Sequence, residues 1–343
     1  MCTMKNWKLK MLPLAAIALM GCSESEEVEI RSTSNINDIH FSLVMEFDEN
    51  QLEGINLGMA SDPENNTLFV ASRKDYPLTL SANRETLLAI DLNSNTVLET
   101  EFQQSDFITK EVEVTSENVL VFGGQYVNFY NKGSVGDPTS VTHGKILTNF
   151  NTATYGDGIL IIGGDFFEVE SDKVFFWEAA VPEQFSEMAQ LPQDRYGADG
   201  EVIGETLYVV GGTSDKTQNL ASNTIFEVSL SDGQTSNQYT MPFEVEDTFI
   251  DKYEEYIIAA GLLKTTNEAE ETFGKTSFLG FFNTQDKQFY AFEMNDLQDD
   301  FGDGAIGNIA MIQNTLYMLY GKIEFNEAME PVAKWSLLKA DLQ

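Results

Sequence analysis

A small group of basic, aromatic and acidic side chains could recognise a ligand in this chain of 343 residues. Arg195 stands directly before Tyr196, a pair that suits a carboxylate or a sugar, because a guanidinium donates paired hydrogen bonds and stacks on rings. The other candidate ligand-binding residues are Arg73, Lys74, Tyr76, Asp165 and Phe167. For each residue taken alone, a surface salt bridge or a packing role is the favoured interpretation.

The chain opens on a basic and then apolar segment. Lysines up to Lys10 precede the apolar stretch 11–20, and Gly21 stands just before Cys22. A positively charged start, an apolar core of about 7–15 residues and a small residue at the cut site are typical of a secretory signal. Residues 1–21 are therefore predicted to form a signal peptide that is removed.

The motif Leu19-Met20-Gly21-Cys22 resembles the lipobox of bacterial lipoproteins. The resemblance implies that the Cys22 thiol carries lipid and tethers the mature protein to a membrane. An ordinary signal peptide that happens to be followed by a cysteine is the alternative.

The acidic run 23–29 follows the predicted lipid site. It resembles the export signal of Bacteroidetes surface lipoproteins, which implies the outer membrane and the cell surface of a bacterium of that type. Ser23, in place of an aspartate, argues by the same resemblance against retention at the inner membrane. Residues 22–37 are also interpreted as a flexible acidic tether, since like charges repel and keep a chain extended.

Cysteine and histidine are scarce, which limits the chemistry available. Of the two cysteines, Cys2 lies in the predicted signal peptide and Cys22 is the predicted lipid site, so no disulfide, zinc cluster or cysteine nucleophile is expected. The two histidines, His40 and His143, make most imidazole metal sites and a Ser-His-Asp relay improbable. We therefore expect no catalytic residue, no metal and no cofactor.

An aspartate-rich run at 296–304 offers oxygen ligands that could bind calcium. Its spacing departs from the EF-hand pattern, because no glutamate stands at the last ligand position. A solvated acidic loop is the favoured interpretation.

The net charge of the chain is −35, and loss of the lysines in the signal peptide would make it more negative. Such a charge repels nucleic acid and anionic lipid headgroups, so no nucleic-acid partner is expected and the lipid must supply membrane attachment.

One short phrase recurs six times along the chain: polar turn residues, an apolar strand, then one or two glycines or small residues. The copies lie at 65–72, 116–124, 156–164, 204–212, 253–261 and 313–321. Self-similarity of this kind predicts a solenoid or a propeller.

Each copy sits in a unit of four predicted strands, and no helix is expected beyond the signal peptide. In the fourth unit the strands are predicted at 200–203, 206–210, 223–230 and 236–241, since runs rich in Val, Ile, Tyr and Phe are bounded by turn residues. Residues 38–343 are therefore predicted to form one all-β domain, a six-bladed propeller of four-stranded antiparallel blades. An arrangement of two β-sandwiches is the alternative.

The repeats resemble kelch blades, which have four strands and about 50 residues each. The double glycines Gly123-Gly124, Gly163-Gly164 and Gly211-Gly212 match the kelch signature, where a Cβ would block a backbone bend. Trp177 and Phe226 stand near the expected aromatic position. The first, fifth and last units lack the glycine pair, so the resemblance is to a degenerate kelch array.

The two ends of the domain are expected to complete one blade together. The last unit runs out at its third strand, 335–342, and the isolated strand 40–47 would supply the fourth and close the ring. The loops after the second strands are long, so the ligand site is placed on their face.

The favoured function is that of a noncatalytic surface binding protein, which presents a propeller face to a glycan, a peptide or a partner in an envelope complex. The alternative from another class is an enzyme that resembles the kelch-type sugar mutarotases, with Arg73, Arg195 and Glu201 near the channel. Galactose-oxidase chemistry is rejected because no free cysteine is available for its crosslink, and Ser231-Asp232-Gly233 is too compressed for a sialidase Asp-box. A structural or assembly factor of the envelope remains a third option.

Overall fold

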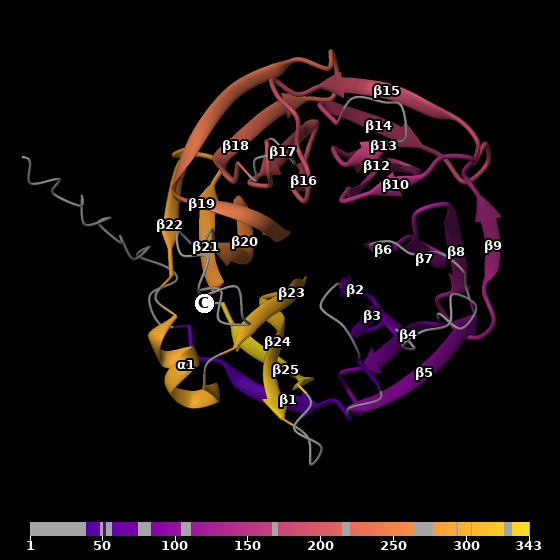
Figure 1. The fold of residues 1–343 in the computed structure, drawn as a ribbon, viewed down its shortest axis with the longest axis vertical. Helices are drawn as coiled ribbons and strands as arrows, with labels where there is room; N and C mark the ends of the chain where they lie inside the picture. Colours follow the sequence, from indigo (N-terminus) through magenta and orange to yellow (C-terminus); the bar gives the residue numbers. More distant parts are fainter. Residues whose placement is uncertain are drawn as a thin grey trace, which may run out of the picture. The chain divides into compact units, whose positions relative to one another are not determined.

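A computed structural model describes residues 39–48, 51–52, 57–74, 84–103, 111–166, 171–214, 220–263, 277–292, 294–302, 304–325 and 331–342. The described part is almost entirely antiparallel β-structure, and most of its strands are labelled in Figure 1. No helix in these ranges has the length and apolar character needed to cross a membrane.

The first three sheets each contain four strands that are hydrogen-bonded in chain order. Sheet one comprises β2 (Gly58–Asp62), β3 (Thr67–Lys74), β4 (Arg84–Asp91) and β5 (Thr96–Gln103). Sheet two comprises β6 (Glu111–Val114), β7 (Asn118–Phe122), β8 (Tyr126–Asn131) and β9 (Thr139–Thr142). Sheet three comprises β11 (Asn151–Tyr155), β12 (Gly158–Ile162), β14 (Lys173–Trp177) and β15 (Phe185–Gln190), and a small extra pair is formed by β10 (Leu147–Thr148) and β13 (Asp165–Phe166).

The next seven strands form one continuous sheet. They are β16 (Asp199–Ile203), β17 (Thr206–Val210), β18 (Ser222–Ser229), β19 (Thr235–Tyr253), β20 (Tyr256–Leu263), β21 (Ser277–Asn283) and β22 (Gln288–Ala291). The first part of β19 pairs with β18 and its second part pairs with β20, so the strand belongs to two four-stranded sets. We call the set β16–β19 sheet four and the set β19–β22 sheet five.

The last sheet joins the two ends of the described chain. Sheet six comprises β23 (Ala305–Ile312), β24 (Thr315–Phe325), β25 (Pro331–Asp341) and, at its edge, β1 (Ser42–Glu46). Ser42 of β1 pairs with Lys339 of β25, and Glu46 pairs with Ser336. The expected strand near the start of the domain therefore pairs antiparallel with the last strand of the chain.

Neighbouring sheets pack through apolar side chains, in an order that returns to its start. Six buried clusters fill the junctions of sheets one and two, two and three, three and four, four and five, five and six, and six and one. The first strands of the sheets also contact one another in this cyclic order, from β2 through β6, β11, β16, β19 and β23 back to β2. Burial on both faces explains the continuous apolar pattern of the second strands, such as Gly158–Ile162, where every residue is buried.

The glycine pairs allow close approach between sheets. Gly163 has a φ of 59°, and a Cβ on it would lie 2.2 Å from the carbonyl oxygen of Arg195. The N–H of Gly164 donates a hydrogen bond of 2.7 Å to that same oxygen. Glycine is required here both by the left-handed backbone and by the contact with Arg195, in the segment that leads from β15 to β16.

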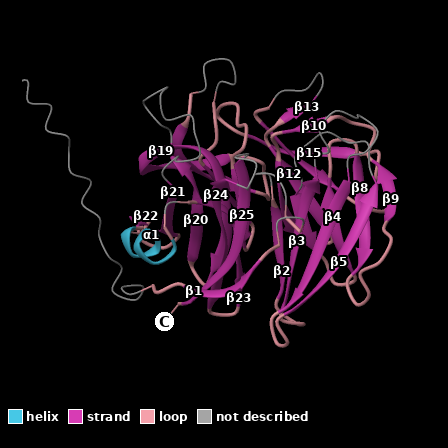
Figure 2. Cartoon of the chain, turned by 60° about the horizontal axis from the view of Figure 1, so that its bottom comes forward, coloured by secondary structure: helices cyan, strands magenta, loops and turns pink. Residues whose placement is uncertain are grey.

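One helix interrupts the β-structure, and the expectation of no helix beyond the signal peptide was wrong. Helix α1 (Asn295–Phe301) covers much of the aspartate-rich run that was interpreted as a solvated loop (Figure 2). Leu297 is buried and Phe301 is partly buried against the cluster between sheets five and six. These two apolar residues, four positions apart, lie on one face of a helix, and that contact with the core stabilises the turn.

Candidate functional site in the central pocket

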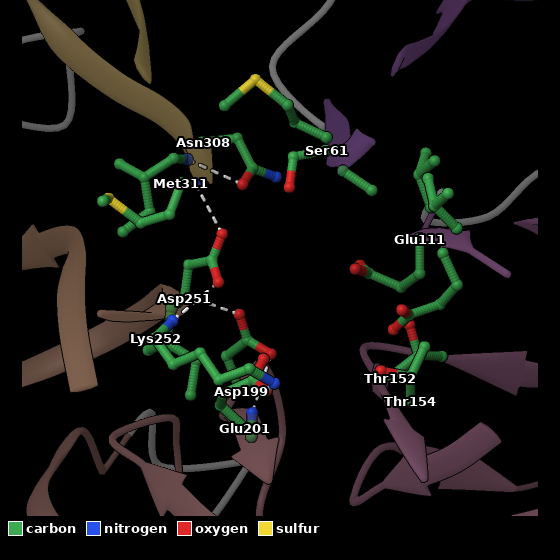
Figure 3. A pocket seen from close by; sticks show the side chains of 18 of the residues that line it. Ser61, Glu111, Thr152, Thr154, Asp199, Glu201, Asp251, Lys252, Asn308 and Met311 are labelled. Atoms are coloured by element: carbon green, nitrogen blue, oxygen red, sulfur yellow. Dashed lines mark hydrogen bonds and ion pairs between the residues drawn. The ribbon is translucent and has the colours of Figure 1, made fainter. Parts of the chain in front are cut away.

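The first strands of all six sheets line one polar pocket with a volume of about 390 Å³ (Figure 3). Its polar and charged lining residues are Ser61, Glu111, Glu113, Thr152, Thr154, Asp199, Glu201, Asp251, Lys252, Asn308 and Gln313. No aromatic side chain is among the described lining residues. The pocket extends to Pro63 and Gln313, in the hairpin turns that follow β2 and β23.

Five carboxyl groups from three sheets, the second, fourth and fifth, face this pocket. Glu111 and Glu113 are two residues apart on β6, and Asp199 and Glu201 are two residues apart on β16. Alternate residues of a strand point to the same side, so each pair faces the pocket together. Asp251 on β19 is the fifth, and Lys252 is the one basic residue among the described lining residues.

Two of these carboxylates join the first strands of neighbouring sheets. Asp199 of sheet four accepts a hydrogen bond of 2.8 Å from the backbone N–H of Ile250 in sheet five. Asp251 of sheet five accepts one of 2.6 Å from the backbone N–H of Met311 in sheet six. Both side chains therefore hold the pocket wall together as well as lining it.

Asparagines perform the same role at two other junctions. Asn151 of sheet three donates from Nδ2 to the carbonyl oxygen of Ala198 at 2.7 Å, and Asn308 of sheet six donates to that of Leu57 at 2.7 Å. Asn151 pairs with Ile162, the last residue of β12, which directly precedes Gly163. Asn308 pairs with Leu319 of β24, which is separated from Gly321 by one residue. The position is therefore suited to a side chain that reaches the next sheet.

Glu111 occupies the corresponding position in sheet two but makes no such bond. It pairs with Phe122, the last residue of β7 before the double glycine, as Asp199 pairs with Val210. Its side chain forms no hydrogen bond or ion pair with another described residue, and Figure 3 shows its carboxyl group pointing into the pocket. Among the described residues, the Glu111 carboxyl group thus forms no hydrogen bond that joins two sheets.

Burial and mutual repulsion raise the pKa values of four of these carboxyl groups. Burial, together with the charges of Asp199 and Glu113, raises the pKa of Glu111 well above its ordinary value. Burial raises the pKa of Glu113 to about 8, with Glu201 and Asp251 adding to the shift and a hydrogen bond from Thr152 opposing it.

The aspartates are shifted in the same direction. Burial is the main cause of the raised pKa of Asp199, and outweighs the backbone hydrogen bonds that it accepts. Burial and the charge of Glu201 raise the pKa of Asp251 to about 7. The pocket therefore holds protons near neutral pH that carboxyl groups in water would have lost.

The lysine of the pocket is already engaged. Lys252 donates to Glu201 at 2.6 Å and approaches the carbonyl oxygen of Val202 at 3.4 Å. Burial alone would lower the pKa of Lys252, but the negative charges of Glu201, Asp251 and Glu113 raise it above its ordinary value. The Lys252 ammonium group is thus bound to Glu201, one of the five carboxyl groups of the pocket.

Arg195, a predicted ligand-binding residue, lies in the core rather than in the pocket. It is fully buried, donates to the carbonyl oxygen of Asp194 at 2.9 Å and to the hydroxyl of Thr224, and lies 4.5 Å from the ring centre of Phe226. Burial without a carboxylate partner lowers the pKa of Arg195 to about 10, with Asp194 opposing the shift. Arg195 therefore has the packing role that was the alternative to ligand binding.

The remaining predicted site residues are not brought together at the pocket. Tyr196 is half-buried and forms a β-bridge with Thr213. Arg73 and Lys74 end β3 and Asp165 begins β13, and for these three the structure describes the backbone alone. Tyr76, Phe167 and Cys22 lie outside the described residues, as do most residues of the long loops that were expected to carry the site.

The sequence did contain a signal for the pocket that was missed. Glu111-Val112-Glu113 and Asp199-Gly200-Glu201 place acidic residues two apart in segments that precede the recurring apolar strands, where apolar residues would be expected on a buried face. Of the pocket residues, only Glu201 was considered, as a member of the enzyme alternative.

Comparison with models of known protein families found no match, and neither did comparison with curated proteins.

Proposed function

We propose that this protein is a binding protein built as a six-bladed propeller of degenerate kelch-like repeats, with its ligand site in the central pocket. The six sheets correspond to the blades, with β19 shared between the fourth and the fifth. Two observations support this architecture: the cyclic order of the six apolar junctions, and the cyclic contacts among the first strands.

The observation that carries the binding role is the convergence of carboxyl groups from three sheets on one pocket. Buried ionisable groups cost free energy unless they are paired, so natural cores avoid them where no function requires them. Groups with strongly shifted pKa values inside a concave pocket are candidates for a functional site. A ligand bound there would contact side chains held by six different strands.

The cellular setting of the proposal rests on the sequence. A lipid on Cys22 would anchor the protein in the outer membrane, with the acidic tether 22–37 directing it to the cell surface. Its ligand would then be a glycan, a peptide or a small molecule outside the cell, or a partner in an envelope complex.

A binding screen on the full-length protein in detergent tests the proposal. Thermal unfolding is followed in the presence of oligosaccharides, basic and acidic peptides, amines and metal ions, since a ligand that binds the folded state raises the melting temperature. The proposal predicts that at least one class raises it, and that Glu111→Gln reduces the effect. Absence of any shift across all classes would contradict it.

A specific observation also favours a second candidate, an enzyme that resembles the kelch-type sugar mutarotases. The pKa values of about 7 for Asp251 and about 8 for Glu113 are in the range that suits proton transfer at neutral pH. Exchange between the anomers of sialic acid, galactose and glucose can be followed by NMR. No acceleration over the buffer rate for any of them would eliminate this candidate.

A further inference from the structure

We propose that the ligand of the central pocket is an organic cation with a primary ammonium group, which binds between Glu111 of sheet two and Asp199 of sheet four. This inference rests on the proposed binding function and names the ligand class of the same pocket.

The pocket has more acidic than basic groups among its described lining residues. Five carboxyl groups face it, and the one described basic lining residue, Lys252, is bound to Glu201 at 2.6 Å. No described lysine or arginine forms an ion pair with Glu111, Glu113 or Asp199. A cationic ligand would supply the missing charge.

The carboxyl group of Glu111 forms no hydrogen bond or ion pair with another described residue. At the corresponding positions Asn151, Asp199 and Asn308 each bond to a backbone group in or directly before the first strand of the next sheet, whereas Glu111 points into the pocket without a partner among the described residues. Glutamate therefore stands in sheet two where the other sheets have an asparagine or aspartate that forms a hydrogen bond between sheets. Because the Glu111 carboxyl group forms no such bond, it is available to a ligand.

The repulsion between the two walls identifies where the cation binds. The charge of Asp199 contributes to the raised pKa of Glu111, and both carboxyl groups line the same pocket. A cation between them would favour both ionised forms. A neutral, hydroxyl-bearing ligand would leave that repulsion in place.

A metal ion fits this wall less well than an ammonium group. No group of three or more Asp, Glu, His or Cys residues in the described ranges is arranged to hold a metal. Asp199 and Asp251 are fixed by backbone N–H groups of the neighbouring sheets, so they cannot converge on one ion without breaking those bonds. An ammonium group donates hydrogen bonds in several directions to acceptors that stay where they are.

The absence of aromatic side chains from the described lining distinguishes primary amines from quaternary ones. Quaternary ammonium groups are recognised by aromatic cages, because they have no N–H to donate. This pocket offers carboxylate, amide and hydroxyl oxygens, which require a donor.

The test is isothermal titration calorimetry of the full-length protein in detergent micelles at about 0.15 M salt, where exposed charges are screened beyond about 8 Å. Spermidine and putrescine are the primary-amine probes, tetramethylammonium is the quaternary probe, and calcium chloride and glucose represent the competing classes. Glu111→Gln removes the partnerless charge, and Glu205→Gln, in an exposed hairpin turn, is the matched control. Titration in two buffers of different ionisation enthalpy reports protons released on binding.

We expect a primary amine to bind with release of protons, Glu111→Gln to weaken binding about tenfold, a loss of about 1.4 kcal/mol, and Glu205→Gln to leave it unchanged. If Glu111→Gln does not fold, Glu113→Gln is expected to weaken binding in the same direction. Equal effects of the pocket and control variants would overturn the inference, because the amine would then bind the acidic surface at large. Binding of calcium, glucose or the quaternary probe alone would overturn the ligand class while leaving the binding function intact. No binding by any probe would also overturn the ligand class, and the wider thermal screen then decides separately whether the binding function fails.

Discussion

Asp251 accepts a hydrogen bond from the backbone N–H of Met311 at 2.6 Å, and this bond joins the first strand of sheet five to the first strand of sheet six. The same carboxyl group lines the pocket and has a raised pKa. One side chain therefore both joins two sheets and lines the pocket, so substitution of Asp251 is expected to affect the sheets and the pocket together.

Asp251→Ala is expected to lower the free energy of unfolding by about 1–3 kcal/mol, because a buried backbone N–H loses its acceptor. Asp251→Asn keeps an oxygen that can accept the bond and removes the repulsive charge, so it should cost less. Urea denaturation of both variants measures the difference. Equal stability of the alanine variant and the natural protein would show that the bond to Met311 does not hold the two sheets together.

Gly163→Ala is expected to destabilise the protein more than Gly156→Ala does. Both glycines have a φ of 59°, so both substitutions incur a left-handed backbone penalty of about 1–2 kcal/mol. A Cβ at Gly163 would also meet the carbonyl oxygen of Arg195 at 2.2 Å, whereas nothing lies within 4 Å of a Cβ at Gly156. Melting temperatures of the two variants isolate the steric effect, and identical values would contradict the close packing of sheets three and four.

The stability of the protein is expected to fall as the pH rises from about 5 to about 8.5. The folded state holds protons on Asp251 and Glu113, with pKa values of about 7 and about 8, that the unfolded chain loses near pH 4. Because the folded state binds more protons in this window, raising the pH favours unfolding. Urea denaturation across the range measures the slope, and Glu113→Gln should flatten it. A stability that increases with pH would show that these groups are not raised.

Cys22→Ser is expected to release the protein from the membrane. The substitution removes the thiol that the lipobox resemblance implies to be lipidated, and the acidic surface gives no other attachment to anionic lipid. Phase partition in detergent and mass spectrometry of the first peptide of the mature chain check this. An unmodified Cys22 in the natural protein would remove the basis for the anchor.

Periodic features of the fold could be predicted from the sequence because each depends on a local pattern. The strand at Thr206–Val210 was predicted with the bounds it has, since Gly204-Glu205 makes a turn before an apolar run that ends at Gly211. The strand predicted at 236–241 is wrong at its end, because β19 continues to Tyr253. Near Pro242, β19 changes its hydrogen-bonded partner from β18 to β20.

The site could not be predicted in the same way. Glu111 and Asp251 are more than 130 residues apart in the chain. The acidic pairs at 111–113 and 199–201 are visible in the sequence, but each alone does not show that it faces the same pocket as the other. Their common feature is the position of the first strands, which emerges only when the sheets pack against one another. Arg195 illustrates the converse, since a basic residue beside a tyrosine turned out to be held by a neighbouring hydroxyl and a ring in the core.

A crystal structure of the full protein grown with spermidine would show directly whether the pocket binds an ammonium group. We expect a closed ring of six sheets with ligand density in the central pocket, and an ammonium nitrogen within about 3 Å of a Glu111 carboxylate oxygen. An empty pocket with spermidine bound instead on the loops around Arg73 and Tyr196 would contradict it.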